Sequence, residues 1–450
     1  MSNAGNHPSL HLESRKKWTE KGTSRIVPVG DTLKKVIPIA KKIGVTRLAD
    51  ITHMDVLKIP NYSAVLPGTE DYIWVYSGKG PTRAHAKASA LMECVERYSS
   101  LPGTAARSYV TGTYEKLEKE YGRKNVLHPD DVLEPLKFEY KDHIQMDFLE
   151  AIDLFTDEKI LVPAGIALSR YEPSNGSLNP FQFSHTNGLA SGNVLEEAIC
   201  HAICEVIERD AVSLADLRSS AIPFHFLRTL IDVLRQSGLN VNSLQSDGYV
   251  DDPDLFSEID VANVEFPYAR SLIGRFDDEN IPLLIKDITT DIGIPTFIAT
   301  SVQWVTHDYG YLAEGHGTHP DARIALVRAI TEVSQTRAAN IHGARDDLRR
   351  MNYEMGNTAE TKAWQFMHSR HNKDFGAVKT FENIDILDDI NLLLDSLANV
   401  GLKRAIVVIL TNPDIGIPVV RVIVPGLETF KVTKGVIGWR ARNHFPKSRI

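Results

Sequence analysis

Two stretches of the chain repeat one another without a gap, and this repeat limits the folds that the chain can adopt. AKASALMECVERYSS at 86–100 lies over AICHAICEVIERDAV at 198–212, with matching alanines and a shared Glu-x-x-Glu-Arg. A looser third copy is ALVRAITEVSQTR at 325–337, in which Glu332 and Gln335 take the two glutamate places. Three helices of one pattern in a single chain indicate repeated structural units.

Runs that are typical of β-strands lie between the repeats and predict an α+β fold. These runs are DYIWVYS, EKILVPAGIAL, IPLLIKDI, IPTFIATSVQWV, RAIVVIL and VVRVIVP. Their irregular spacing favours largely antiparallel sheets over a doubly wound parallel sheet. Each repeat helix follows a glycine-containing segment that predicts a turn, namely SGKGP at 77–81, LASGN at 189–193 and GHGTHP at 315–320.

The repeats also suggest how the chain is divided. We expect a helical or extended N-terminal segment over residues 1–70, followed by one domain over residues 71–450. Within this domain the internal repeats are expected near 71–168, 185–300 and 301–450.

The repeat helices carry acidic or polar side chains on one face. At about 100° per residue, Asn193, Glu197, Glu205 and Glu208 fall on one side of their helix. The matching faces of the other two helices hold Ser89, Glu93 and Glu96, and Arg328, Glu332 and Gln335. A merely solvated acidic face would include lysines that form favourable pairs, and these faces carry none. We therefore expect the three faces to line a common cavity.

Clustered carboxylates need cations, because like charges repel and burying them uncompensated is costly. Oxygen ligands without a convincing His/Cys set favour Mg²⁺ over zinc. Mg²⁺ takes only one or two protein carboxylates and fills its shell with phosphate oxygens and water. More than two carboxylates therefore indicate more than one Mg²⁺ and a nucleotide triphosphate, whose charge Arg25, Arg209 and Arg328 would complement.

Other segments allow rival interpretations. SGKGPT at 77–82 is not a P-loop, because position 73 is Ile and Lys79 is followed by Gly. A turn before a helix is favoured there, and contact with phosphate or substrate stays open. Cys200 and Cys204 are expected to be small buried apolar side chains.

Two histidine-containing motifs raise the question of a metal site. Glu197, His201 and Glu205 have ligand spacing on a helix, but the sibling helices carry Ser89 and Arg328 in the place of His201. HGTHP at 316–320 is expected to be a structural turn.

Composition excludes several classes of protein. The formal net charge is -8 and no basic stripe is present, which argues against nucleic-acid binding. Three cysteines are too few for a disulfide framework, and no apolar run reaches the roughly 18 residues of a membrane-spanning helix. We expect a cytoplasmic protein that does not bind membranes.

Four strings together resemble the YcaO superfamily of ATP-dependent enzymes that modify peptide backbones. They are SGKGPTRAHAKASALMECVERYSS, NGLASGNVLEEAICHAICEVIERDA, HPDARIALVRAITEVSQTR and VVRVIVPGLE. The resemblance covers roughly residues 20–440. It implies an α+β fold of repeated units that binds ATP and Mg²⁺ through glutamate-bearing helices, without a P-loop.

The resemblance also implies roles for individual residues. Catalytic roles fall to Glu93, Glu205, Glu208 and Arg209, and the three glutamates would also hold metal. Nucleotide contacts fall to Ser89, Glu96, Asn193, Glu197, Arg328, Glu332 and Gln335. A basic residue seven positions before a hydroxyl residue adds Arg25 and Thr32.

The family includes several reactions. Members that form azolines usually end in a proline-rich tail, whereas this chain ends in GWRARNHFPKSRI. That ending resembles the thioamide-forming branch, which is associated with a TfuA-like partner and takes sulfur from sulfide or a sulfur carrier. The best-known members of this branch make thioglycine in methyl-coenzyme M reductase. Azoline formation, a non-catalytic nucleotide-binding scaffold and a homodimer stay open as alternatives.

Overall fold

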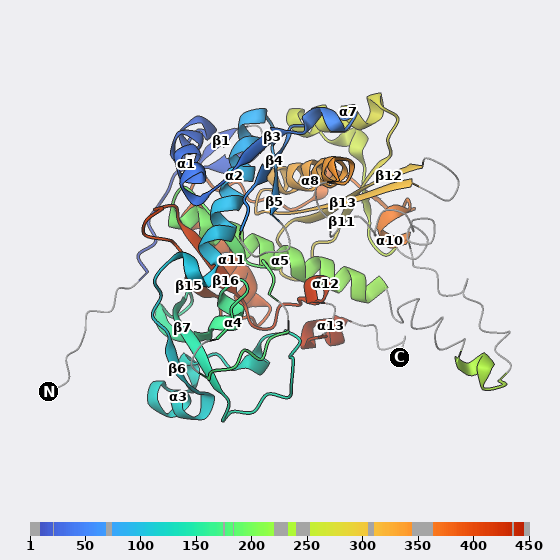
Figure 1. The fold of residues 1–450 in the computed structure, drawn as a ribbon. Coiled ribbons are helices and arrows are strands. Elements are labelled where there is room, and N and C mark those ends of the chain that lie inside the picture. The colour runs from blue at the N-terminus through green and yellow to red at the C-terminus, as the bar shows by residue number, and fades with distance from the viewer. Residues whose placement is uncertain are drawn as a thin grey trace.

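A computed structural model (Figure 1) describes residues 10–20, 22–68, 74–173, 176–182, 184–219, 233–239, 253–304, 310–343, 363–433 and 436–444. Within these ranges, no helix combines the length and the apolar character that crossing a lipid bilayer requires. The prediction of a cytoplasmic location is not tested further.

The predicted α+β class with largely antiparallel sheets is confirmed. A hairpin pairs β1 (Trp18–Glu20) with β2 (Thr23–Arg25). A three-stranded sheet has the order β3 (Arg47–Asp50), β4 (Asn61–Val65) and β5 (Val75–Lys79). A five-stranded sheet has the order β13 (Gly310–Thr318), β12 (Thr296–Trp304), β11 (Leu283–Asp287), β10 (Glu258–Ile259) and β14 (Asn372–Lys373).

The remaining sheet has six strands. Its order is β6 (Val110–Thr113), β7 (Gln145–Asp153), β15 (Ile406–Ile409), β16 (Val419–Ile423) and β9 (Leu189–Ser191), with β8 (Glu158–Pro163) beside β7. Among the described strands, β10 and β14 form the parallel pair.

Six long helices and several short ones accompany these sheets in the described ranges. The long ones are α1 (Val29–Ile43), α2 (Arg83–Ser100), α5 (Leu195–Ser219), α7 (Pro267–Asp278), α8 (Ala322–His342) and α11 (Ile386–Asn399). The short ones are α3 (Tyr114–Tyr121), α4 (Ala164–Ala167), α10 (Ala363–Phe366), α12 (Phe430–Thr433) and α13 (Trp439–His444). Turns of 3₁₀-helix span Thr52–Met54, Pro102–Thr104, Arg123–Asn125, Pro129–Asp131, Val261–Asn263 and Phe375–Ala377.

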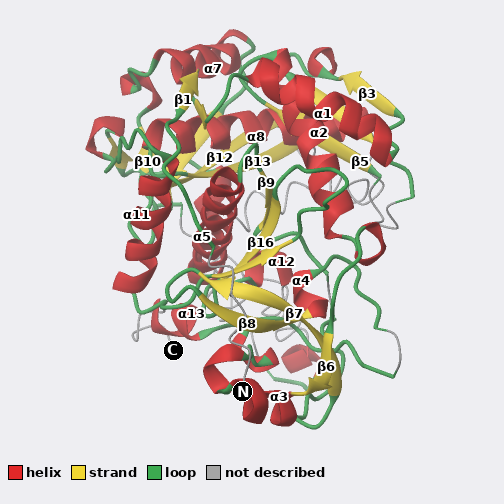
Figure 2. Cartoon of the chain, turned by 90° about the vertical axis from the view of Figure 1, so that its left-hand side faces the viewer, coloured by secondary structure: helices red, strands yellow, loops and turns green. Residues whose placement is uncertain are grey.

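β15, an inner strand of the six-stranded sheet, is covered on both faces over residues 406–408. Ile406 and Val408 of β15 pack into a core that also holds α1 and α2, whereas Val407 points to the opposite core with α5 and α11. Side chains alternate between the faces of a strand, so a continuous apolar run such as AIVVIL fits a strand covered on both sides. Figure 2 shows α5 and α11 on one side of β9 and β16. In a third core, α7 and α8 pack on the five-stranded sheet.

The segments before the repeat helices are strands for most of their length, so the predicted turns are wrong there. β5 ends at Lys79, β9 covers Leu189–Ser191, and β13 continues through HGT to Thr318. The glycines serve close packing instead. A Cβ at Gly78 would lie 2.2 Å from the carbonyl oxygen of Ala86, and one at Gly317 would lie 2.0 Å from that of Ala325. Each strand thus crosses its helix nearly backbone to backbone.

This packing yields a first prediction. Gly317→Ala is expected to lower the free energy of unfolding by about 1–3 kcal/mol, because the new methyl group meets the backbone of α8. Urea denaturation followed by circular dichroism measures the change. The matched control is Gly103→Ala, since a Cβ at Gly103 has no atom within 4 Å. Equal free energies of unfolding for the two variants would show that β13 and α8 can move apart without a loss of stability.

The N-terminal region is joined to the rest of the fold. β4 precedes the boundary predicted at residue 70 and β5 follows it, yet the two pair antiparallel in one sheet. α1 packs with α2 in the same core. The division at residue 70 and the three repeat boundaries stay predictions.

Candidate functional site

A cavity of about 380 Å³ lies where the three repeat helices meet. Residues of α1, α2, α5 and α8, of the strands β5 and β9 and of the β1–β2 hairpin line it. Figure 1 shows these elements in the fold. The structure brings all thirteen residues predicted for the nucleotide site to this cavity: Arg25, Thr32, Ser89, Glu93, Glu96, Asn193, Glu197, Glu205, Glu208, Arg209, Arg328, Glu332 and Gln335. What each of them binds stays a prediction.

Two carboxyl groups in this cavity have raised pKa values. Burial, with Glu208 nearby, raises the pKa of Glu205 to about 7, although Arg209 and Arg97 oppose the shift. Burial also raises the pKa of Glu96 well above its usual value, and the charges of Glu205 and Glu93 add to this despite Arg97. These groups resist ionisation in the protein alone, and a bound cation would remove that resistance.

Glu208 has a buried carboxylate oxygen that is available to a bound ligand. Its side chain is buried, and its Oε2 atom has no hydrogen-bond partner among the described residues. A buried polar atom without a partner is rare and costly. No group of three or more His, Cys, Asp or Glu side chains in the described ranges is placed to hold a metal by protein ligands alone. This donor set fits Mg²⁺, which needs few carboxylates when phosphate and water complete its shell.

Glu197 and Asn193 form a network that fixes neighbouring segments. The Oε2 atom of Glu197 accepts hydrogen bonds from the backbone N–H and the Nδ2 of Asn193 at 2.7 and 2.9 Å. Its Oε1 accepts from the backbone N–H of Ile26 at 2.6 Å. Thr32 Oγ1 donates to Asn193 Oδ1 at 2.9 Å. Both oxygens of Glu197 are therefore engaged, and the network joins α5 to α1 and to the chain after β2.

Lys79 is a cavity residue whose place sequence reasoning left open. Its Nζ forms an ion pair with Glu332 of α8, and it also donates to the carbonyl oxygen of Arg328 at 3.3 Å. Burial alone would raise the pKa of Glu332, but Lys79 and His316 together lower it well below its usual value. Burial lowers the pKa of Lys79. The partner is 253 residues away along the chain, so no local signal could have identified the pair.

The alternative metal site on α5 is not formed. Arg328 Nη2 lies 3.0 Å from His201 Nε2, and the two oxygens of Glu197 are engaged as described above. Burial, followed by the charges of Arg328 and Arg25, lowers the pKa of His201 well below its usual value. A neutral His201 that accepts from Arg328 holds this guanidinium at the cavity wall.

The other cysteine and histidine predictions have mixed outcomes. Cys200 and Cys204 are free and buried, as predicted. The structural turn predicted at 316–320 is wrong for its first three residues, which belong to β13. Both His316 and His319 are buried, and His319 lines the cavity.

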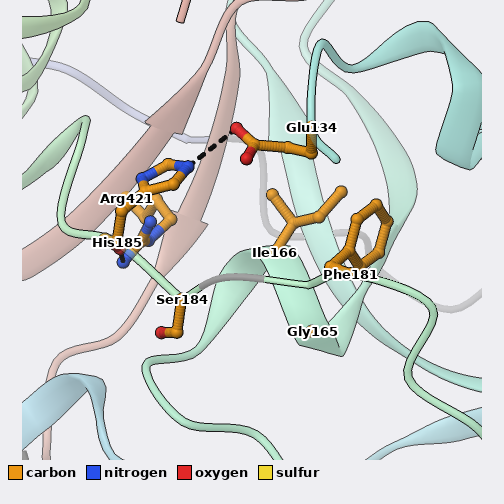
Figure 3. Close-up of a pocket in the computed structure, with 7 residues that line it drawn as sticks. All are labelled: Glu134, Gly165, Ile166, Phe181, Ser184, His185 and Arg421. Carbon is orange, nitrogen blue, oxygen red and sulfur yellow. Dashed lines mark hydrogen bonds and ion pairs between the residues drawn. The ribbon is translucent and has the colours of Figure 1, made fainter. Parts of the chain in front are cut away.

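A second, much smaller recess lies beside β16 (Figure 3). Its volume is about 10 Å³, which is about the minimum for a single water molecule. His185 Nε2 and Glu134 Oε1 lie 2.7 Å apart, and Arg421 Nη2 donates to the carbonyl oxygen of His185 at 2.7 Å. Burial lowers the pKa of Arg421 to about 10. The recess is too small for a nucleotide.

The sequence model of one family, described as YcaO cyclodehydratase, ATP- and Mg²⁺-binding, matches residues 77–428. The chain belongs to the YcaO family. The family identified from the sequence is therefore confirmed. YcaO proteins are ATP-dependent peptide-modifying enzymes.

Two relatives span nearly the whole YcaO chain. An uncharacterised protein of Methanothermobacter thermautotrophicus is 34% identical over 420 residues, which are 92% of this chain and 97% of the relative. An uncharacterised protein in the tfuA 3′ region of Rhizobium leguminosarum bv. trifolii is 29% identical over 416 residues, with 90% and 88% coverage.

Solved structures share the fold. The YcaO protein of Methanopyrus kandleri, bound with AMPPCP and Mg²⁺, aligns with a TM-score of 0.67 at 21% identity over 95% of this chain and 98% of that one. A heterocyclase in complex with substrate and cofactor aligns with a TM-score of 0.73 at 23% identity, and covers 94% of this chain. The chain spans 55% of that heterocyclase. At these identities the likeness establishes the fold.

Proposed function

We propose that this YcaO protein uses ATP and Mg²⁺ to replace a peptide-bond oxygen by sulfur and so forms a thioamide. The observation that carries the proposal is the meeting of half-buried and buried carboxylates from α2 and α5 in one cavity, where Glu208 has an oxygen without a partner among the described residues. The relative in the tfuA 3′ region supports the thioamide-forming branch.

We assign the predicted roles to residues that line this cavity. Glu93, Glu205 and Glu208 hold Mg²⁺, and Arg209 and Arg328 contact phosphate. When bound, Mg²⁺ neutralises the phosphates and orients an in-line transfer. Arg209 stays fully charged, because the neighbouring Glu208 and Glu205 raise its pKa against the effect of burial.

The reaction removes a poor leaving group. Hydrosulfide attacks the carbonyl carbon of the peptide bond and forms a tetrahedral oxyanion. The γ-phosphoryl group of ATP is transferred to this oxygen, which forms a new P–O bond and releases ADP. The original C–O bond then breaks and expels phosphate, while the S–H group loses its proton and the C=S bond forms. The products are the thioamide, ADP and inorganic phosphate. Arg209 and Arg328 stabilise the negative charge that develops during transfer.

The proposal extends to partners and substrate. The substrate is a peptide or protein, with thioglycine formation in methyl-coenzyme M reductase as the specific reaction that the family resemblance suggests. A TfuA-like protein assists, and sulfide or a sulfur carrier supplies the sulfur. The same purified protein serves to test whether the chain forms a homodimer. It also serves to test whether ATP is hydrolysed without a peptide product.

Intact mass of the peptide product is the test. Purified chain, peptide, ATP, Mg²⁺ and sulfide are incubated with and without a TfuA-like protein. We expect a mass increase equal to the difference between sulfur and oxygen, together with release of phosphate. Loss of one water would instead support azoline formation, which the description of the family as cyclodehydratases makes the second candidate. No phosphate release with any peptide would support a non-catalytic scaffold.

A further inference from the structure

The β1–β2 hairpin places a large aromatic side chain at the cavity. Trp18 and Arg25 are paired directly across the two strands, and both line the cavity. Side chains that are opposite in an antiparallel pair lie on the same face. The indole is 52% exposed. Among the described residues that line the cavity, Trp18 is the one Phe, Tyr or Trp side chain.

The hairpin is anchored on both sides. Before β1, the backbone N–H of Lys17 donates to the carbonyl oxygen of Ile384 at 2.9 Å, and Lys17 Nζ pairs with the buried Asp389 of α11. After β2, the backbone N–H of Ile26 donates to Glu197 of α5. Both flanks of the hairpin are thus held by buried or half-buried polar contacts, which keep the backbone of Trp18 beside the cavity without a ligand.

The cavity has an apolar end and a charged end along α8. Gly22 of the hairpin packs so closely on Val327 that a Cβ there would lie 2.9 Å from its Cγ2. The apolar residues Val27, Val29, Ile324 and Val327 line the cavity with Trp18. Glu332 lies five residues further along α8, which is about 7.5 Å of helix. There it pairs with Lys79 at the charged end.

We propose that Trp18 is the stacking wall for the nucleobase, with the triphosphate directed toward the carboxylates of α2 and α5. This inference rests on the proposed use of ATP. A flat indole face beside aliphatic side chains suits a purine ring, and Arg25 on the same face of the hairpin is placed for the ribose–phosphate part. Stacking on an aromatic ring commonly strengthens binding by about 5- to 150-fold.

Nucleotide binding to the full chain tests the inference without a peptide substrate. Calorimetry with ATP and Mg²⁺ is expected to show a Kd raised about tenfold or more in Trp18→Ala, and nearly unchanged in Trp18→Phe. Trp74→Ala is the matched control, because Trp74 is 51% exposed and lies outside the cavity. Inorganic tripolyphosphate with Mg²⁺ is expected to bind all four proteins equally. ATP is expected to quench tryptophan emission in the wild type but not in Trp18→Phe.

Several outcomes would overturn the inference. Wild-type affinity for ATP in Trp18→Ala would remove the stacking role. An equal loss of affinity for ATP and tripolyphosphate would place the defect in the cavity as a whole. If ATP bound the wild type but no thioamide formed with any peptide, the proposed function would fail while this inference stood. If ATP failed to bind the wild type, both would fall.

Discussion

Glu205→Gln is expected to lower ATP-dependent turnover at least about 100-fold while leaving the fold intact. The glutamine has nearly the same volume but cannot neutralise a cation. Glu205 lies in the middle of α5 and shares the cavity with Glu208 and Arg209. Removal of one of several mutually repelling carboxylates does not disturb the packing of α5. Phosphate release and intact product mass measure the loss.

The same variant separates metal binding from catalysis. For the wild type, ATP and Mg²⁺ at about 100 times the Kd should stabilise the folded state by about 2.7 kcal/mol and raise the melting temperature. We expect this thermal shift to be small or absent in Glu205→Gln, because the metal-bound nucleotide has lost a carboxylate ligand. A normal shift with lost turnover would restrict Glu205 to the chemical step.

A matched variant controls for the loss of a carboxylate as such. The side chain of Glu150 of β7 is 58% exposed and pairs with Lys159 at 2.9 Å. Glu150 does not line the cavity. Glu150→Gln is expected to keep wild-type turnover. Glu93→Gln should behave like Glu205→Gln, because Glu93 holds the matching place on α2. Near-normal activity in both cavity variants would defeat the assignment of these glutamates to metal.

The repeat made most of the site predictable. Helical periodicity fixes which residues share a face, so the alignment of three helices was enough to select side chains from Ser89 to Gln335 that meet in one cavity. The predicted apolar runs overlap β5, β8, β11, β12, β15 and β16, whereas other described strands, such as β4, β7 and β13, were not identified. The segments before the helices were misjudged, because glycine is typical both of turns and of close backbone approach. Only the contacts of Gly78 and Gly317 with their helices distinguish the two.

Residues placed by long-range contacts could not be predicted. Lys79 belongs to the cavity because Glu332 of α8 lies opposite it, and Trp18 because Lys17 and Ile26 are anchored to α11 and α5. None of these pairings leaves a periodic pattern in the sequence. The same holds for the buried ion pair that joins α5 to the C-terminal helix.

Arg440→Met is expected to lower the free energy of unfolding by about 3–5 kcal/mol. Arg440 and Asp210 are fully buried, with Nε–Oδ1 and Nη2–Oδ2 distances of 3.0 Å. Even beside Arg440, burial raises the pKa of Asp210 to about 6. The attraction within the pair therefore offsets the cost of burying the two charges only in part. Removal of Arg440 leaves the buried carboxylate of Asp210 without its main partner. Urea denaturation measures the change, and Arg123→Met, whose side chain is 88% exposed, should change stability by less than about 0.5 kcal/mol.

The double variant Asp210→Leu/Arg440→Met decides whether the loss comes from an orphaned charge. Replacement of both partners by apolar groups commonly restores stability. We expect partial recovery here, because Asp210 Oδ1 also accepts from the backbone N–H of Glu428 at 2.9 Å. No recovery would mean that Arg440 acts through Asp291 instead, which lies 2.7 Å away. Asp210 directly follows the cavity residues of α5, so Arg440→Met should also weaken ATP binding. The double variant should restore ATP binding to the extent that α5 regains its position.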